Sequence, residues 1–270
     1  MGGSTKDHRD IYYRQSKVDG YRARSAYKLL QIDELFGLLQ CDSYAMNDTW
    51  SFDEIVPRRR LGEEQVEKQR RGPGPSRVVD LCAAPGSWSQ VLTQKLSPGA
   101  RIVAVDLQPM APIAGVVQVL GDITTQETAN EVVRHLHGEG AELIVCDGAP
   151  DVTGVHDLDE KLHAQLMLAA LQIVLRVLER GGTFVAKIFT RQESGELLTL
   201  QFRQWFADVS IVKPRSSRAA SAEHFLVCRN FSPPPGFDPI ATPAALASGQ
   251  RTHLARELGV TACGDLSGYD

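Results

Sequence analysis

Two lysines and two acidic residues stand where their charges need an explanation. Lys187 lies in the apolar run Thr183-Phe184-Val185-Ala186-Lys187-Ile188-Phe189, although a lysine is almost never fully buried without a partner. Asp147 ends another apolar run, Glu223 begins the last one, and Lys28 lies in a segment with helical spacing. Each residue also has an ordinary interpretation. Lys187 could be a lysine that reaches water, and Asp147 could be a turn cap. Glu223 could be a solvated acid and Lys28 an exposed helical lysine. As a set, on elements that could converge above one edge of a sheet, they have the residue types for moving a proton.

A second group of residues predicts a ligand-binding turn. The run Val78-Val79-Asp80-Leu81-Cys82-Ala83-Ala84-Pro85-Gly86-Ser87-Trp88 predicts a buried strand that breaks at a Pro-Gly turn and restarts as a helix. Such a turn presents backbone N–H groups and a helix N-terminus to a ligand. Asp106 ends the next apolar strand, 20 residues after Gly86, a distance suited to binding ribose hydroxyls. Because only one glycine is present, the pattern favours a nucleoside without phosphate, and S-adenosylmethionine is the commonest such cofactor.

Two residues near this turn have two interpretations each. Asp122, after the third strand, could accept a hydrogen bond from an adenine amine or cap the following helix. Trp88 could pack on the methionine part of the cofactor or fix the helix to the sheet. None of the seven histidines has metal-ligand spacing with cysteines or acids, so we predict no metal site.

The surrounding pattern predicts the elements that must position these residues. From residue 77 onward, strand and helix patterns alternate, which is typical of a mostly parallel sheet covered by helices on both faces. The expected strands are 78–81, 102–106, 116–120, 143–147, 184–188, 209–212 and 225–228, and the expected helices are 22–35, 87–96, 125–136, 160–178 and 196–206. Only residues 213–224 join the last two strands, too few for a helical crossover, so we expect an antiparallel hairpin and a mixed sheet. Ligands of such sheets bind at the carboxyl ends of the strands.

The chain is expected to form one domain with two additions. Its 270 residues, 43% of them hydrophobic, suffice for one large α/β domain, which we place at 1–230. Residues 41–76 are polar and charged, with Gly72-Pro73-Gly74-Pro75 near their end, and predict a surface insertion. The Pro-rich residues 231–270 predict a C-terminal tail.

The cysteines and the apolar stretches indicate the compartment. Five scattered cysteines without a C-x-x-C pair indicate reduced thiols rather than disulfides or zinc ligands. The N-terminus is polar and charged, without the pattern of a signal peptide. The longest apolar stretch, 164–178, is interrupted by Gln165, Gln172 and Arg176, so we expect a core helix and no contact with a membrane. Together these features favour a cytoplasmic protein.

Basic residues gather in two segments of an otherwise acidic chain. The net charge is −4, but residues 1–30 carry seven Lys/Arg against three Asp, and residues 58–77 carry seven against three Glu. Local basic arms on an acidic body favour a nucleic-acid partner. Solvated surface segments are the alternative interpretation.

Taken together, these residues resemble the FtsJ/RrmJ-like 2′-O-ribose RNA methyltransferases over residues 4–39 and 77–230. The Lys-Asp-Lys-Glu tetrad of that family falls, in order, on Lys28, Asp147, Lys187 and Glu223. Several segments look like the eukaryotic tRNA branch of the family: 10–14, 22–28, 147–154, 213–218 and 263–270. The insertion at 41–76 departs from the family pattern, which leaves the tetrad untouched but bears on partner choice.

The resemblance implies a fold, a reaction and partners. The fold would be the Rossmann-like methyltransferase fold, with a seven-stranded, mostly parallel sheet and helices on both faces. The enzyme would methylate riboses of the tRNA anticodon loop, at the wobble nucleotide and the one two before it, together with an auxiliary protein that selects the site. The cofactor contacts would fall on Gly86, Trp88, Asp106, Asp122 and Asp147. Four arginines are expected to contact RNA phosphates: Arg22, Arg24, Arg215 and Arg218.

The residues lead to one catalytic hypothesis and leave three alternatives. Lys187 would orient the ribose 2′-hydroxyl and accept its proton, and the residue types leave open whether it is a general base or an orienting group. One alternative is an NAD-dependent oxidoreductase, against which the missing glycines argue. Another is a non-catalytic RNA-binding subunit, against which the complete tetrad argues. The third keeps the reaction but changes the substrate to rRNA or an mRNA cap.

Overall fold

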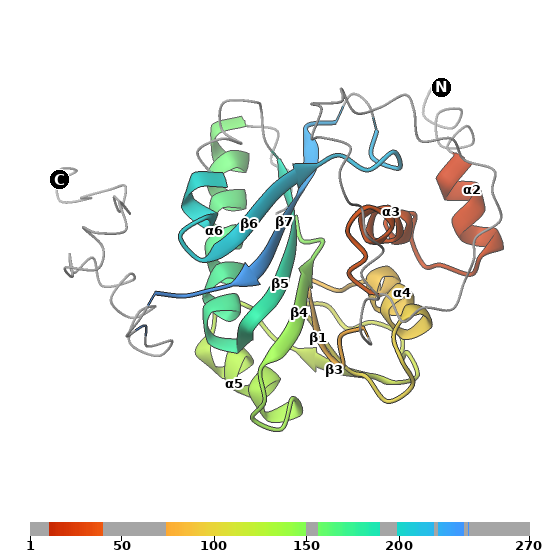
Figure 1. Ribbon diagram of the computed structural model, residues 1–270. Coiled ribbons are helices and arrows are strands. Elements are labelled where there is room, and N and C mark those ends of the chain that lie inside the picture. Colours follow the sequence, from red (N-terminus) through yellow and green to blue (C-terminus); the bar gives the residue numbers. More distant parts are fainter. Residues whose placement is uncertain are drawn as a thin grey trace, which may run out of the picture.

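A seven-stranded sheet forms the centre of the molecule, with the strand order β3-β2-β1-β4-β5-β7-β6 (Figure 1). The strands are β1 (Arg77–Leu81), β2 (Arg101–Asp106), β3 (Val116–Leu120), β4 (Ala141–Cys146), β5 (Leu178–Phe189), β6 (Phe206–Val212) and β7 (Glu223–Phe231). The helices are α2 (Ile11–Val18), α3 (Ala26–Phe36), α4 (Ser87–Lys95), α5 (Gln126–His135) and α6 (His156–Val177). The computed structural model describes residues 11–39, 74–149, 156–189, 199–218, 221–234 and 237.

The sheet is parallel from β3 through β5 and antiparallel at β7. β7 pairs with both β5 and β6, which confirms the predicted hairpin and mixed sheet. In the register of β5 with β7, Lys187 faces Phe225 and Phe189 faces Glu223. The carboxyl end of β5 and the amino end of β7 therefore lie at the same edge as the carboxyl ends of β1, β2 and β4.

Helices cover both faces of the sheet, as predicted (Figure 1). Alternate residues of a strand point to opposite faces. Val79 belongs to the core that β1 shares with α5 and α6, whereas its neighbour Val78 belongs to the core shared with α3 and α4. Because β1 is buried on both faces, its sequence is a continuous apolar run rather than an alternating one.

The structure differs from the predicted elements mainly at the N-terminal side. The helix expected at 22–35 begins at Ala26 and ends before Gly37, which has the left-handed φ of 61° common after helix ends. α2 was not predicted, because its sequence has no apolar stripe that would indicate a helix. Among its residues only Ser16 is buried. In the described part of the chain, no helix has the length and apolar character needed to cross a membrane.

Most of the predicted insertion and tail lie outside the described residues. The start of the tail packs back on the domain, because the Ser232 N–H donates to the Trp205 carbonyl at 2.7 Å. The ring of Phe237 lies 5.2 Å from that of Trp205. β7 ends at Phe231, and the described residues that follow it stay in contact with the domain.

Candidate active site

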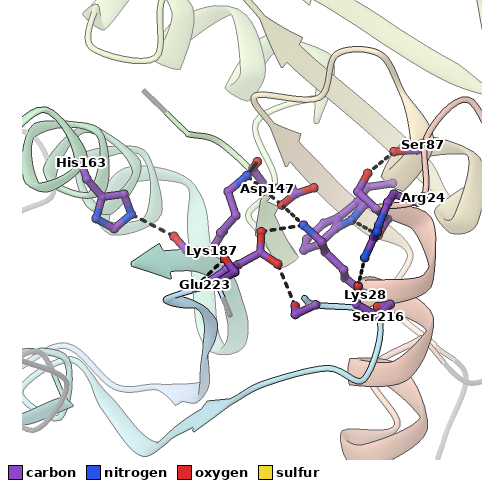
Figure 2. A network of polar contacts seen from close by, with 12 residues as sticks. Arg24, Lys28, Ser87, Asp147, His163, Lys187, Ser216 and Glu223 are labelled. Atoms are coloured by element: carbon purple, nitrogen blue, oxygen red, sulfur yellow. Dashed lines mark hydrogen bonds and ion pairs between the residues drawn. The ribbon is translucent and has the colours of Figure 1, made fainter. Parts of the chain in front are cut away.

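Four elements bring the predicted tetrad together at the carboxyl edge of the sheet (Figure 2). Lys28 comes from α3, Asp147 follows β4, Lys187 lies near the end of β5 and Glu223 begins β7. Their side chains form a continuous line of contacts, with exposed fractions of only 10 to 15%. Residues separated by up to 195 positions in the chain thus form one compact polar cluster.

Lys187 is held by Asp147 in two ways. Its Nζ donates to the Asp147 backbone carbonyl at 2.6 Å and lies 3.1 Å from Oδ1 of the Asp147 carboxylate. That Oδ1 atom is buried and makes no hydrogen bond within the described residues, so its contact with Lys187 is an ion pair. An ammonium group has three N–H donors, and Asp147 occupies two directions around Nζ.

Lys28 and Glu223 form the other half of the cluster. Lys28 Nζ donates to Glu223 Oε2 at 2.7 Å and lies 3.9 Å from Asp147 Oδ1. The Ser217 hydroxyl donates to the other oxygen of Glu223 at 2.7 Å. Burial alone would raise the pKa of Glu223, but the hydrogen bonds and charge of Lys28, with Ser217, lower it below its usual value. Glu223 is therefore an anion at neutral pH and fixes Lys28 beside Asp147.

His163, on α6, supports the cluster from behind the sheet. Its Nε2 lies 3.3 Å from the Lys187 backbone carbonyl, and its ring meets that of Phe189 edge-on at 5.3 Å. Burial is the main cause that lowers the pKa of His163, so the ring is neutral at pH 7 and can donate to that carbonyl. His163 and Ser217 could not be predicted from the sequence, because neither has a motif of its own.

Gly86 ends the turn between β1 and α4 in a backbone conformation that favours glycine. Its φ is 101°, and a Cβ atom there would lie 2.7 Å from Arg22 Nη1 and 2.8 Å from Ile113 Cδ1. Asp106 braces the same turn, because its two carboxylate oxygens accept hydrogen bonds from the Ala84 N–H at 2.8 Å and the Gln108 N–H at 2.7 Å. The turn that was predicted to bind a nucleoside is thus hydrogen-bonded to Asp106, which is partly exposed beside it.

The structure separates the two interpretations of Asp122 and of Trp88. Thr125, rather than Asp122, caps α5 by accepting from the Thr128 N–H, while Asp122 accepts from the Thr124 N–H at 2.8 Å and remains partly exposed. The Trp88 side chain is only 2% exposed, and its indole N–H donates to the Ser25 carbonyl at 2.9 Å. Its predicted contact with the cofactor is therefore not supported, because the ring is used to fix α4 to α3 and the sheet.

Asp80 is a buried acid that the sequence analysis did not single out. It is fully buried in β1, and the Ser89 hydroxyl donates to its Oδ2 at 2.6 Å. Burial, with smaller contributions from Asp147 and Asp106, raises the pKa of Asp80 to about 7. The signal that could have identified it is the one that identified Lys187, a charged residue inside an apolar strand.

The four candidate RNA-binding arginines do not lie in one place. Arg24 donates to the Ser216 carbonyl, and Arg215 and Arg218 are exposed on the same 213–218 loop. Burial and the neighbouring charge of Arg218 lower the pKa of Arg24, which places two like charges close together beside the tetrad. Arg22 instead donates to the carbonyls of Pro85 and Pro112.

The residues around Gly86 fit a nucleoside cofactor without phosphate. Acidic side chains gather here: Asp80 beneath the turn, and Asp106, Asp122 and Asp147 at the ends of their strands. Among the described cations nearby, Lys28 and Lys187 are paired with Glu223 and Asp147, and the Arg22 guanidinium beside Gly86 donates to two backbone carbonyls. This edge would repel a pyrophosphate but suits the positively charged sulfonium of S-adenosylmethionine.

Comparisons with known proteins agree with this arrangement. Residues 21–231 match the family described as FtsJ-like methyltransferase. The chain is 47% identical over 279 residues to the tRNA (cytidine(32)/guanosine(34)-2′-O)-methyltransferase of Homo sapiens, covering 100% of this chain and 74% of that protein. It is 46% identical over 281 residues to the enzyme of the same name from Schizosaccharomyces pombe, covering 100% of this chain and 86% of the relative.

More distant similarities reach proteins that act on another RNA. The rRNA methyltransferase spb1 of Aspergillus fumigatus is 36% identical over 234 residues, covering 87% of this chain but 25% of that protein. Among solved structures, a Plasmodium falciparum protein described as a ribosomal RNA methyltransferase superposes with a TM-score of 0.58 at 21% identity, covering 78% of this chain and 98% of the other. This last similarity supports the fold alone.

Proposed function

The chain belongs to the FtsJ-like methyltransferase family, and on that premise we propose that it transfers a methyl group from S-adenosylmethionine to ribose 2′-hydroxyls of tRNA, at cytidine 32 and guanosine 34. The substrate is the one named for relatives that align with the whole chain at 46 to 47% identity. The observation that supports the proposed reaction is a convergence of four side chains beside the Gly86 turn: Lys28, Asp147, Lys187 and Glu223.

Each residue of the cluster has a role in this proposal. S-adenosylmethionine, when bound, supplies an electrophilic methyl group on a positively charged sulfur. In the proposed step Lys187 acts as the neutral amine, reached when its ammonium has given up a proton: it holds the 2′-hydroxyl oxygen in line with that methyl group and takes the hydroxyl proton as the new C–O bond forms and the C–S bond breaks. Asp147 fixes Lys187, whereas Glu223 fixes Lys28, whose charge lies close enough to stabilise developing negative charge on the oxygen.

The first test is transfer of a labelled methyl group to tRNA by the full chain. We expect 2′-O-methylcytidine and 2′-O-methylguanosine after digestion of total tRNA. Synthetic anticodon stem-loops that carry 2′-deoxyribose at nucleotide 32 or 34 are matched controls, because each lacks one acceptor hydroxyl. Labelling of rRNA or capped mRNA in place of tRNA would contradict the proposed substrate. Bound cofactor without any transfer, even after cell extract is added, would contradict the proposed reaction.

Arg218, one of the two exposed arginines of the 213–218 loop, gives a second prediction. If Arg218 contacts a phosphate of the tRNA, Arg218→Ala should weaken tRNA binding and reduce the slope of log affinity against log salt concentration by about 0.7. Arg203→Ala is the control, since Arg203 is an exposed arginine on the segment before β6. Titrations between low and moderate salt measure both slopes, and an unchanged slope in Arg218→Ala would exclude this contact.

The partner and the compartment follow as parts of the same proposal. We propose that an auxiliary protein selects the nucleotide to be modified, and that the enzyme works in the cytoplasm. Adding cell extract to the methylation assay tests the first point, because a site that is modified only with extract requires a second component. The rRNA alternative is less favoured, since the relative described as an rRNA methyltransferase is only 36% identical.

A further inference from the structure

Arg22 lies at the meeting point of three segments that surround the Gly86 turn. Its Nη1 donates to the Pro85 carbonyl at 2.8 Å, and its Nη2 donates to the Pro112 carbonyl at 3.0 Å. Its own backbone N–H donates to Oε1 of Gln90, on α4, at 2.8 Å. The guanidinium therefore bridges the loop that follows β1 and the loop that follows β2, while its backbone is tied to α4.

These two loops contain or adjoin the residues that are predicted to contact the cofactor. The first contains Gly86, and the second begins just after Asp106 at the end of β2. They approach closely, since a Cβ on Gly86 would lie 2.7 Å from Arg22 Nη1, 2.8 Å from Ile113 Cδ1 and 3.2 Å from Met110 Sδ. Glycine at 86 is therefore required by the guanidinium that packs on it as well as by its φ of 101°.

From this geometry we propose that Arg22 is a positioning residue of the cofactor site, which holds the loops after β1 and β2 at the separation that S-adenosylmethionine requires. This replaces the phosphate contact expected for Arg22 from the sequence, and it rests on the proposed function. A planar guanidinium can donate to two carbonyls in different directions, whereas an ammonium is a point donor. The carbonyls that Arg22 joins are 27 positions apart in the chain, and the fork of one arginine spans them.

The remaining arginines support this separation of roles. Arg24 points to the 213–218 loop, where it contacts Ser216 (Figure 2), and the exposed Arg218 is close to it. Arg22 and Arg24 are two positions apart, yet their guanidiniums lie against different loops. Ser25, the next residue after Arg24, contacts Ser87 at 2.6 Å and also contacts Trp88. These contacts anchor the segment that carries both arginines to the start of α4.

The decisive experiment measures cofactor binding and tRNA binding separately on the full chain. Isothermal titration of Arg22→Gln with S-adenosylmethionine, and with its demethylated product S-adenosylhomocysteine, should give dissociation constants about 10- to 100-fold above those of the unchanged protein, because two charge-assisted hydrogen bonds are lost. The tRNA dissociation constant and its salt slope should stay within roughly twofold. Arg218→Ala is the matched variant for which we expect the opposite result, with weaker tRNA binding and unchanged cofactor binding.

Arg22→Lys keeps the charge and provides a second variant should Arg22→Gln fail to fold. We expect it to recover only part of the cofactor affinity, since one ammonium cannot bridge both carbonyls. Hydrogen exchange of residues 83–86 and 110–113 should be faster in the variants, which a phosphate-binding role would not cause. Unchanged cofactor affinity in both variants, with a reduced tRNA salt slope, would overturn the proposal. If the unchanged protein itself did not bind S-adenosylmethionine, the proposed function would fail instead.

Discussion

Lys187→Ala is expected to lower the kcat of methyl transfer by about 10³-fold, in the range lost when a general base is removed, while S-adenosylmethionine stays bound. The alanine variant loses the only described amine that lies within 3.1 Å of the Asp147 carboxylate. It also loses the donor to the Asp147 carbonyl. The hydroxyl of the ribose would then lose the amine that is proposed to hold it and to accept its proton.

Lys187→Arg separates the two roles that Lys187 could have. An arginine keeps a positive charge next to Asp147 but cannot accept a proton in a protein. If Lys187 is a general base, the arginine variant should be about as inactive as the alanine variant. If Lys187 only orients the hydroxyl by charge, the arginine variant should recover a measurable part of kcat.

The kinetic comparison needs a stability control, because Asp147 would lose a buried partner. Breaking a buried pair on one side is destabilising, so cofactor titration and thermal unfolding should accompany each rate measurement. Lys95→Ala is a matched control, since Lys95 is an exposed lysine at the C-terminal end of α4. A Lys187→Ala protein that binds cofactor and keeps kcat within a few-fold of the unchanged enzyme would rule Lys187 out as the catalytic group.

The sheet could be predicted because its strands are continuous apolar runs bounded by turn residues. All seven expected strands are present, and the short connection before Glu223 correctly predicted that β7 is antiparallel. Lys187 and Asp147 were predicted to lie together because parallel strands place their carboxyl ends at one edge. The pattern of parallel strands therefore predicted both the architecture of the sheet and the positions of Lys187 and Asp147, two of the four residues in the polar cluster.

The contacts that depend on loops could not be predicted in the same way. The partners of Arg22 are backbone carbonyls of Pro85 and Pro112, and a backbone carbonyl has no signature in a sequence. Trp88 could be assigned to the ligand or to the core until its neighbour Ser25 was located in space. Asp80 was not singled out, because it lies at the start of a motif that was interpreted from the Pro-Gly turn at its other end.

Asp80→Asn is expected to change how the stability of the protein depends on pH. The unfolded chain ionises Asp80 near its ordinary pKa of 3.8, whereas the folded protein keeps the proton up to a pKa of about 7. Between these values folding takes up a proton, so the contribution of Asp80 to stability falls as pH rises from about 4 to about 7 and is constant above that. The difference between the two pKa values corresponds to at most about 4 kcal/mol.

Because asparagine does not ionise, the Asp80→Asn variant should gain stability relative to the unchanged protein across this window. Urea unfolding of both proteins at pH 5, 6, 7 and 8 measures the difference, which should rise to about pH 7 and then level off. The offset at pH 5 reports the hydrogen bonds of the new amide, including the one from Ser89, and does not affect the slope.

Ser89→Ala provides the control that links the effect to Asp80. The Ser89 hydroxyl lowers the pKa of Asp80 by donating to Oδ2, so its loss should raise that pKa further and move the pH window upward. Asp147 and Asp106 are the other charges that raise the pKa of Asp80, and both remain in the two variants. If the stability curves of Asp80→Asn and the unchanged protein ran parallel from pH 5 to 8, Asp80 would have to be ionised in the fold throughout. Its buried Oδ1, which has no hydrogen-bond partner among the described residues, would then carry charge that the surrounding structure compensates in another way.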